Sequence, residues 1–364
     1  MKKSIHRYTL LTIILLSGML SCTAEKPVFV ASNSNLIHYM GRIVRTDSLS
    51  SFYWSGTSAR INFEGTAVKA ILKDENGKNY YNVIIDGDSI ILLRTNDQKR
   101  IYSLVKDLKP GKHSLELFKR TEYPLGKTDF YGFELEAGAT LLPPDPVSEK
   151  KIEFYGNSIT CGYAVEDYSG KDRPDSIYTN NYLSYAALTA RHYNAEYSCI
   201  SKSGIGITIS WFPYIMPDIY DELIPLDSTS KWDFSRYTPQ LVVIHLLQND
   251  SWLVNMPKHP SFKKYFGTQK PSEEFIINAY KNFVSDLRSK YPNAQIICTM
   301  GGMDATQEGS PWPGYVEEAV RQLNDSKILT YFMPYKKTGG HPNEAEQKVM
   351  AEGLIKFIDE NISW

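Results

Sequence analysis

"KIEFYGNSIT", residues 151–160, joins an apolar run to a turn that contains a serine. Ile152 to Tyr155 has the composition of a buried β-strand, and Gly156 and Ser158 follow it closely. In open sheets of parallel strands, ligands and reactive groups lie beyond the carboxyl ends of the strands. Ser158 is therefore a candidate nucleophile, provided that other strand ends supply a base and hydrogen-bond donors for an oxyanion.

The second half of the chain, residues 151–364, alternates strand-like and helical patterns. Apolar residues at helical spacing run from Leu183 to Tyr193, from Phe275 to Leu287 and from Tyr315 to Leu323, and a last helix is expected near Glu344 to Ile362. This alternation predicts a parallel sheet with helices on both faces. The expected strands are residues 152–155, 196–200, 241–247, 295–300 and 328–333.

The first half of the mature chain, residues 28–142, has a β pattern without a convincing helix. Asn76-Gly77 and Asp86-Gly87 are typical of tight β-hairpins, and Pro110-Gly111 indicates a further turn. Several short strands separated by turn residues predict a β-sandwich of jelly-roll type. The Pro-rich segment 143–150 is a short, stiff linker between this sandwich and the domain at 151–364.

Residues 1–22 are expected to be a signal peptide, because a basic start precedes an apolar run too short to span a bilayer. Met19-Leu20-Ser21-Cys22 resembles a bacterial lipobox, although Met19 stands where leucine is usual. We expect Cys22 to be lipidated and the protein to be exported and anchored in the cell envelope. An ordinary secretory signal with an incidental cysteine is the alternative.

Composition excludes several classes of function. The formal net charge is −1 and the chain has no basic tract, so nothing indicates nucleic-acid binding. After Cys22, the cysteines Cys161, Cys199 and Cys298 have no metal-ligand spacing, which argues against a zinc site. Three cysteines permit at most one internal disulfide, and their apolar neighbours favour buried free thiols.

Three more expected strand ends carry polar groups. Ser203-Gly204-Ile205-Gly206, Gln248-Asn249-Asp250 and His341-Pro342-Asn343 each follow a strand of the predicted sheet. A glycine can present a backbone N–H to a ligand, an asparagine amide can donate a hydrogen bond, and a histidine can act as base. The G-x-S-x-G elbow of α/β-hydrolases is absent, because Thr160 stands at its second glycine.

The blocks "GNSIT", "SGIG", "QND" and "HPN" resemble those of the SGNH, or GDSL-like, hydrolases. Together with "GKHSLELFKRTE" and "YGFEL" in the β domain, they are most similar to carbohydrate esterase family 2, the acetyl xylan esterase-like enzymes. The resemblance implies a jelly roll followed by a flavodoxin-like SGNH domain. It also implies a serine esterase that removes O-acetyl groups from plant-type polysaccharides or oligosaccharides, with no metal or organic cofactor.

The resemblance assigns roles to four residues. Ser158 would be the nucleophile and His341 the general base, and the backbone N–H groups of Ser158 and Gly204 with the Asn249 side chain would form the oxyanion hole. Two positions depart from the usual blocks, with Asn157 in place of aspartate and Leu247 in place of glycine.

The final block lacks the acid that usually stands two or three residues before the histidine. Thr338 and Gly339 occupy those positions. Some acceptor must still fix the proton on the ring nitrogen of His341 that faces away from Ser158. We therefore predict a Ser158–His341 dyad in which a backbone carbonyl orients the histidine.

Three hypotheses of function are compared. The leading one is an acetyl esterase that acts on an acetylated polysaccharide or oligosaccharide and contacts the membrane only through its lipid anchor. The second is a carbohydrate-binding lipoprotein with an impaired hydrolase domain, and the third is an esterase for lipid acyl chains. Trp252, Trp312 and Tyr163 are candidate sugar-stacking platforms, or equally residues that only pack.

Overall fold

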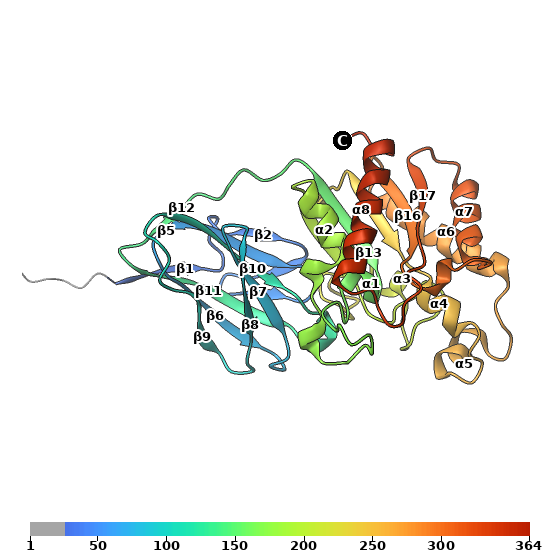
Figure 1. Ribbon diagram of the computed structural model, residues 1–364, viewed down its shortest axis with the longest axis horizontal. Helices are drawn as coiled ribbons and strands as arrows, with labels where there is room; N and C mark the ends of the chain where they lie inside the picture. The colour runs from blue at the N-terminus through green and yellow to red at the C-terminus, as the bar shows by residue number, and fades with distance from the viewer. Residues whose placement is uncertain (1–25) are drawn as a thin grey trace, which may run out of the picture.

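The computed structural model describes residues 26–364. It contains a β-sandwich and an α/β domain that lie end to end along the long axis of the molecule (Figure 1). The predicted signal peptide and the lipidation site Cys22 fall outside the described residues. Among the described residues no helix is both long and apolar enough to cross a membrane.

The N-terminal domain is built from two antiparallel sheets, as predicted. One sheet has the order β3-β4-β11-β6-β9, with β1 paired to β11, and the other has the order β12-β5-β10-β7-β8, with β2 paired to β5. Between them lies an aromatic core in which the rings of Phe52 and Phe130 stack 5.8 Å apart. The strands are β1 (Pro27–Ala31), β2 (His38–Met40), β3 (Ile43–Arg45), β4 (Ser50–Phe52), β5 (Ser58–Glu64), β6 (Val68–Asp74), β7 (Tyr80–Ile85), β8 (Ser89–Arg94), β9 (Arg100–Val105), β10 (Lys112–Lys119), β11 (Thr128–Ala137) and β12 (Thr140–Leu142).

The two predicted hairpin turns differ in outcome. Asp86 and Gly87 both have positive φ, at 54° and 78°, and join the antiparallel neighbours β7 and β8, as a type I′ hairpin requires. Asn76-Gly77 is no hairpin, because it connects β6 in one sheet to β7 in the other. A tight Asn-Gly turn defines a local reversal of the chain but not the sheet that the next strand joins.

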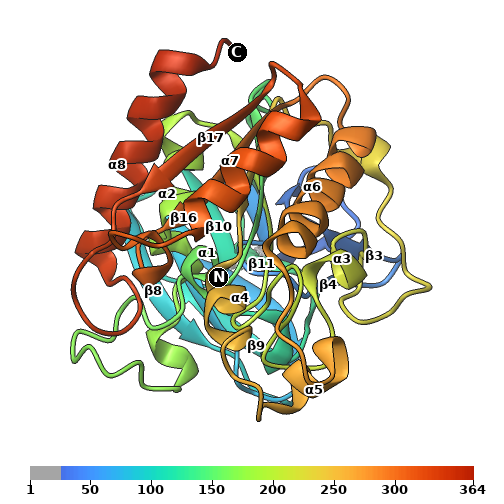
Figure 2. The same ribbon diagram turned by 90° about the vertical axis from the view of Figure 1, so that its right-hand side faces the viewer.

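The C-terminal domain contains the predicted parallel sheet, in the flavodoxin-like order β14-β13-β15-β16-β17. Its strands are β13 (Lys151–Gly156), β14 (Glu196–Ser201), β15 (Leu241–His245), β16 (Gln295–Gly301) and β17 (Ile328–Met333). Helices α2 (Tyr185–His192) and α8 (Glu344–Asn361) share one core cluster with one face of the sheet. Helices α6 (Glu273–Lys290) and α7 (Trp312–Leu323) contribute to the cluster on the other face (Figure 2).

Shorter helices follow the strand ends and cross the loops. They are α1 (Ser158–Cys161), α3 (Met216–Ile219), α4 (Gln248–Leu253) and α5 (Pro260–Phe266), with the 3₁₀ turns η1 (Tyr123–Leu125), η2 (Ser176–Tyr178), η3 (Asn181–Leu183), η4 (Phe234–Arg236) and η5 (Asp304–Thr306). The long helices begin at side-chain caps. Ser272 accepts a hydrogen bond from the Phe275 N–H at α6, and Asn343 forms a reciprocal capping box with Glu346 at α8.

The sandwich packs directly against the α/β domain, in keeping with the short, stiff linker expected at 143–150. Trp54 and Tyr123 of the sandwich belong to the core cluster of the α/β domain. The Arg42 guanidinium is fully buried and donates hydrogen bonds to Glu153 Oε1, at 3.2 Å, and to the Tyr155 hydroxyl, at 2.9 Å. Arg42 thus places its charge against a carboxylate in β13, an inner strand of the sheet in the other domain.

Arg42→Ala should destabilise the whole protein, because it leaves the Glu153 carboxylate buried without its cation. We expect a loss of about 3–5 kcal/mol in the free energy of unfolding, measured by urea denaturation. Arg60→Ala is the matched control, because Arg60 pairs with Asp145 at the surface and should matter by less than about 1 kcal/mol. Equal effects of the two substitutions would contradict this account of the interface.

Candidate active site

Ser158 lies at the carboxyl end of β13, where the chain turns sharply into α1. It is the first residue of this short helix, so its backbone N–H has no acceptor within the helix. Asn157 caps the turn by accepting a hydrogen bond from the Ile159 N–H at 3.0 Å. The turn requires a small residue before it, because a Cβ on Gly156 would lie 2.0 Å from Thr160 Oγ1.

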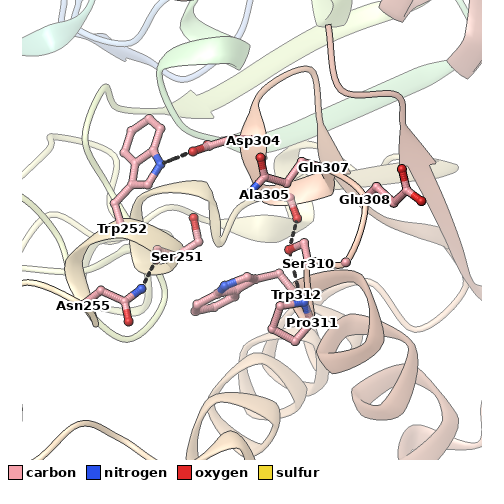
Figure 3. Close-up of a pocket in the computed structure, with 11 residues that line it drawn as sticks. Ser251, Trp252, Asn255, Asp304, Ala305, Gln307, Glu308, Ser310, Pro311 and Trp312 are labelled. Carbon is pink, nitrogen blue, oxygen red and sulfur yellow. Dashed lines mark hydrogen bonds between the residues drawn. The ribbon is translucent and has the colours of Figure 1, made fainter. Parts of the chain in front are cut away.

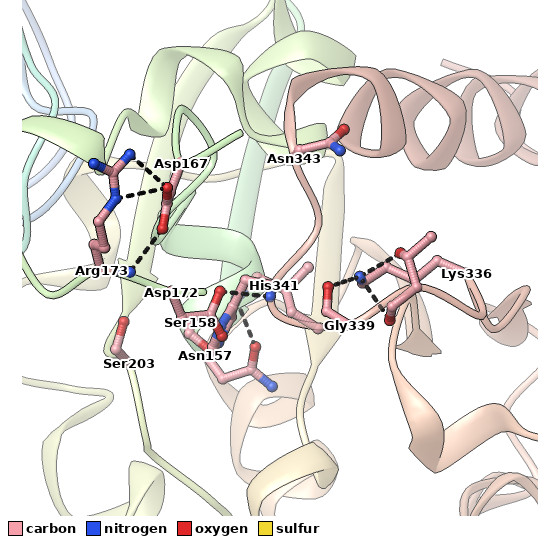
Figure 4. Close-up of polar contacts among 12 residues, drawn as sticks. Asn157, Ser158, Asp167, Asp172, Arg173, Ser203, Lys336, Gly339, His341 and Asn343 are labelled. Carbon is pink, nitrogen blue, oxygen red and sulfur yellow. Dashed lines mark hydrogen bonds and ion pairs between the residues drawn. The ribbon is translucent and has the colours of Figure 1, made fainter. Parts of the chain in front are cut away.

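A chain of hydrogen bonds runs from Ser158 through His341 to Asp172 (Figure 4). Ser158 Oγ lies 2.8 Å from His341 Nε2, and His341 Nδ1 lies 2.8 Å from Asp172 Oδ2. The other oxygen of Asp172 accepts a hydrogen bond from the His341 backbone N–H at 2.8 Å. A proton on Nδ1 bonded to Asp172 leaves Nε2 free to accept the hydroxyl proton of Ser158.

The prediction of a dyad oriented by a backbone carbonyl is therefore wrong. Asp172 supplies the carboxylate from the loop between α1 and η2. Burial acts to raise the pKa of Asp172, but the hydrogen bonds from His341 outweigh it and hold that pKa below its usual value. The acid is a charged partner for His341.

Two local features bring Asp172 to His341. Gly340 has a positive φ of 70°, and a Cβ there would lie 2.8 Å from Asp172 Oδ1, so the close approach needs glycine. The Asp172 loop is closed by Asp167, which accepts hydrogen bonds from the backbone N–H and the guanidinium of Arg173 (Figure 4). These bonds, together with hydrogen bonds from Ser169, lower the pKa of Asp167.

The predicted oxyanion residues lie at the next two strand ends. Gly204 follows β14 with φ of 85°, and a Cβ there would come within 3.2 Å of Trp211 and Phe212. Asn249 lies in the first turn of α4, where Nδ2 donates to the Ile205 carbonyl at 2.8 Å and Oδ1 accepts from Trp211 Nε1 at 3.0 Å. These bonds fix the amide and use only one of its two N–H donors.

The residues beside Asn249 show why glycine is usual at the position of Leu247. Leu247 adopts a left-handed conformation with φ of 73°, which glycine adopts at no steric cost. Asp250 is fully buried and accepts hydrogen bonds from the backbone N–H groups of Ile207 and Thr208. The Asp250 carboxylate thereby ties the loop after Gly204 to the helix that carries Asn249.

The sandwich domain reaches this same loop through Glu122. The carboxylate of Glu122 accepts hydrogen bonds from the Ser203 backbone N–H at 2.6 Å and from the Ser203 hydroxyl at 2.5 Å. Lys119, whose pKa burial lowers to about 7, donates to the Thr121 carbonyl just before Glu122. The residue that precedes Gly204 is thus held by the other domain, an arrangement for which the sequence carries no local signal.

Of the aromatic candidates, Tyr163 lies nearest the reacting groups. Its ring meets that of His341 edge to face, with centroids 4.9 Å apart. Trp211, which the sequence analysis did not select, is 41% exposed and lies beside Asn249. Its exposed ring is suited to stacking on a sugar next to the predicted oxyanion position.

Trp252 and Trp312 line a pocket of about 360 Å³ at the ends of β15 and β16 (Figure 3). The indole N–H of Trp252 donates to the Asp304 carboxylate at 2.9 Å. Trp312 is only 7% exposed, so packing accounts for most of its surface. The other walls of this pocket are polar, with the side chains of Ser251, Asn255, Gln307 and Glu308.

The remaining titratable groups form no metal site among residues 26–364, where no cluster of three or more His, Cys, Asp or Glu side chains could hold an ion. Cys161, Cys199 and Cys298 are buried free thiols, as predicted. Burial raises the pKa of each thiol, so none of them is an activated nucleophile.

Comparison with known proteins identifies relatives of both domains. Residues 39–145 match the carbohydrate esterase 2 N-terminal family. The cellulase/esterase CelE of Acetivibrio thermocellus is 36% identical over 324 residues, which cover 85% of this chain and 38% of CelE. An acetylxylan esterase / glucomannan deacetylase of Cellvibrio japonicus is 25% identical over 344 residues, which cover 92% of this chain and 91% of that protein.

Among solved structures, a family two carbohydrate esterase from Clostridium thermocellum in complex with cellohexaose is 35% identical, with a TM-score of 0.78. The match covers 89% of this chain and 98% of that one, so it spans both domains. On this similarity the chain belongs to carbohydrate esterase family 2.

Proposed function

We propose that this protein hydrolyses O-acetyl esters of plant-type polysaccharides or oligosaccharides through an acetyl-enzyme on Ser158. The observation that carries the proposal is the hydrogen-bonded series Ser158–His341–Asp172. Its serine follows β13, whose neighbours β14 and β15 lead to Gly204 and Asn249. An activated serine needs a base, a group that orients this base, and nearby donors for the oxyanion. The strand-end loops provide the serine, the base and the donors, and Asp172 orients the base.

In the first half of the proposed reaction, Ser158 Oγ attacks the acetyl carbonyl while its proton passes to His341 Nε2. The negative charge that develops on the carbonyl oxygen is stabilised by the backbone N–H groups of Ser158 and Gly204 and by the second amide N–H of Asn249. His341 then gives the proton to the departing sugar oxygen, which leaves as a hydroxyl. Asp172 stabilises the imidazolium throughout this step.

In the second half, water attacks the acetyl group on Ser158. His341 removes one proton from the water and returns it to Ser158 Oγ as the ester bond breaks. Acetate is released and the hydroxyl of Ser158 is restored. The chemistry uses only the residues of this chain and one water molecule.

The surroundings of Ser158 support a sugar ester over a lipid ester. Trp211 and Tyr163 offer aromatic surface beside the reacting groups, and the pocket around Trp252 is mostly polar. A long acyl chain would require a continuous apolar groove. Relatives named acetylxylan esterase / glucomannan deacetylase, and a relative's structure with cellohexaose bound, favour a β-linked plant polysaccharide.

The alternative of a binding protein with an impaired hydrolase domain rested on the missing acid. Asp172 removes that argument, because a carboxylate does bond to His341 Nδ1. Binding without turnover would then require a defect elsewhere in the site. We also propose that the chain is lipidated at Cys22 and held in the cell envelope, on the strength of its lipobox-like sequence.

Ser158→Ala should abolish release of acetate while leaving the fold intact, because it removes the hydroxyl that is bonded to His341 Nε2. We expect turnover of an aryl acetate and of acetylated xylan to fall by several orders of magnitude. Acetate release is measured by coupled assay, with circular dichroism to check the fold. A folded variant with near-parental turnover would refute Ser158 as nucleophile.

Asp172→Asn should lower kcat by about a thousandfold or more, because an amide can hold the wrong tautomer of His341 and carries no charge to stabilise the imidazolium. Asp175→Asn, in the same loop, is the matched control, because Asp175 makes no side-chain cap bond at η2. Steady-state kinetics with an aryl acetate decide the matter. If both variants turn over at the parental rate, Asp172 has no catalytic role.

Cys22→Ser should convert a membrane-bound protein into a soluble exported one, because only Cys22 offers a thiol for lipidation at the expected cleavage site. The measurement is incorporation of a labelled fatty acid, with fractionation of the cells that express each form. Label in the Cys22→Ser variant, or none in the parent, would argue for an ordinary secretory signal.

A further inference from the structure

A second cavity, of about 240 Å³, lies between the two domains at the amino end of the parallel sheet. Residues of β2 and β3 line it on the sandwich side, and Lys151 and Glu196, the first residues of β13 and β14, line it on the other. The length of β13 separates it from the turn at Ser158 by about 20 Å. The cavity is therefore distinct from the candidate active site.

The charged groups of this cavity are unbalanced. Arg45, Lys151 and Arg236 line it, against the single carboxylate of Glu196. Within residues 26–364 none of these three cations forms an ion pair with a carboxylate, whereas Glu196 is bonded to His38 Nε2 at 3.1 Å. His38 adds further positive character, because the bond to Glu196 raises its pKa. The lining thus favours an anion.

Each of the three cations is held over an aromatic ring, and each ring also lines the cavity. The distances from the charged group to the ring centroid are 4.8 Å for Arg45 over Tyr39, 5.2 Å for Arg236 over Trp232 and 5.7 Å for Lys151 over Tyr237.

The rings themselves are fixed in the structure. The Tyr39 hydroxyl donates to the Ser32 carbonyl at 2.6 Å, the Tyr237 hydroxyl donates to the Glu196 carbonyl at 2.8 Å, and Trp232 is 8% exposed. Cations backed by fixed rings lose less side-chain entropy when they bind a ligand than free surface arginines and lysines do.

We propose that this interdomain cavity binds a carboxylate-bearing sugar, a uronate unit of an acidic glycan. The carboxylate meets the guanidinium groups of Arg45 and Arg236, which suit planar oxyanions. Glu196 and His38 offer an acceptor and a ring nitrogen to sugar hydroxyls. The volume lies just below the roughly 300–1,000 Å³ of common small-molecule sites, which suits one sugar ring better than an extended chain.

The binding would act separately from the chemistry at Ser158. A glycan held by an acidic branch at this cavity keeps the protein near chains that also carry acetyl esters, without occupying the reacting groups. The choice of a sugar as ligand rests on the proposed function, whereas the selectivity for an anion rests on the lining of the cavity alone.

The test is isothermal titration calorimetry on the full-length mature Ser158→Ala protein with probes that carry no acetyl ester, so that binding is measured without any turnover. Three probes are compared: an unacetylated xylo-oligosaccharide with one uronate branch, the same oligosaccharide without the branch, and sodium sulfate. We expect the uronate probe to bind about tenfold more tightly than either of the others. Arg45→Gln and Arg236→Gln should each weaken binding of the uronate probe by about tenfold.

Arg94→Gln is the matched control, because Arg94 also lies over an aromatic ring, Tyr80, but outside the cavity. This variant should bind the uronate probe as the parent does. Equal binding of the branched and unbranched probes, or unchanged binding in Arg236→Gln, would overturn the proposal, and binding of sulfate as tightly as uronate would reduce the cavity to a simple anion site. Activity on aryl acetates, measured separately with Ser158 present, tests the proposed function independently.

Discussion

The paired hydrogen bonds between Asp172 and His341 connect segments that are far apart in the sequence and fix the geometry of the whole site. One carboxylate oxygen holds the imidazole ring and the other holds the backbone of the same residue. The histidine loop therefore cannot rotate or retreat from Ser158 without losing both bonds. Gly340 permits this approach, and Asp167 closes the loop that presents Asp172.

The β-sandwich also helps to fix the geometry of the site, through direct contacts with the α/β domain. Glu122 binds Ser203, the residue before Gly204, so one wall of the predicted oxyanion hole is positioned from outside the α/β domain. Arg42, also from the sandwich, reaches Glu153 in β13, an inner strand of the parallel sheet. Because burying a cation beside a carboxylate is costly unless the geometry is good, these contacts favour a single arrangement of the two domains.

Much of this organisation could be predicted from the sequence, for identifiable reasons. The five strands of the parallel sheet and the loops at Ser158, Gly204, Asn249 and His341 each carry a local signal, an apolar run that ends in small or polar residues. Asp172, Glu122 and Trp211 carry none, because each acts through a contact with a residue far away in the chain. Asn76-Gly77 shows the same limit, since a turn pattern cannot specify which sheet receives the next strand.

The central claim is that Asp172 fixes which ring nitrogen of His341 carries the proton, and NMR of protein with ¹⁵N-labelled histidine tests it most directly. At neutral pH the account predicts that His341 carries its proton on Nδ1, with a strongly downfield proton signal that survives Ser158→Ala and disappears in Asp172→Ala. A proton found on Nε2, or a signal that is unchanged when Asp172 is removed, would contradict the account.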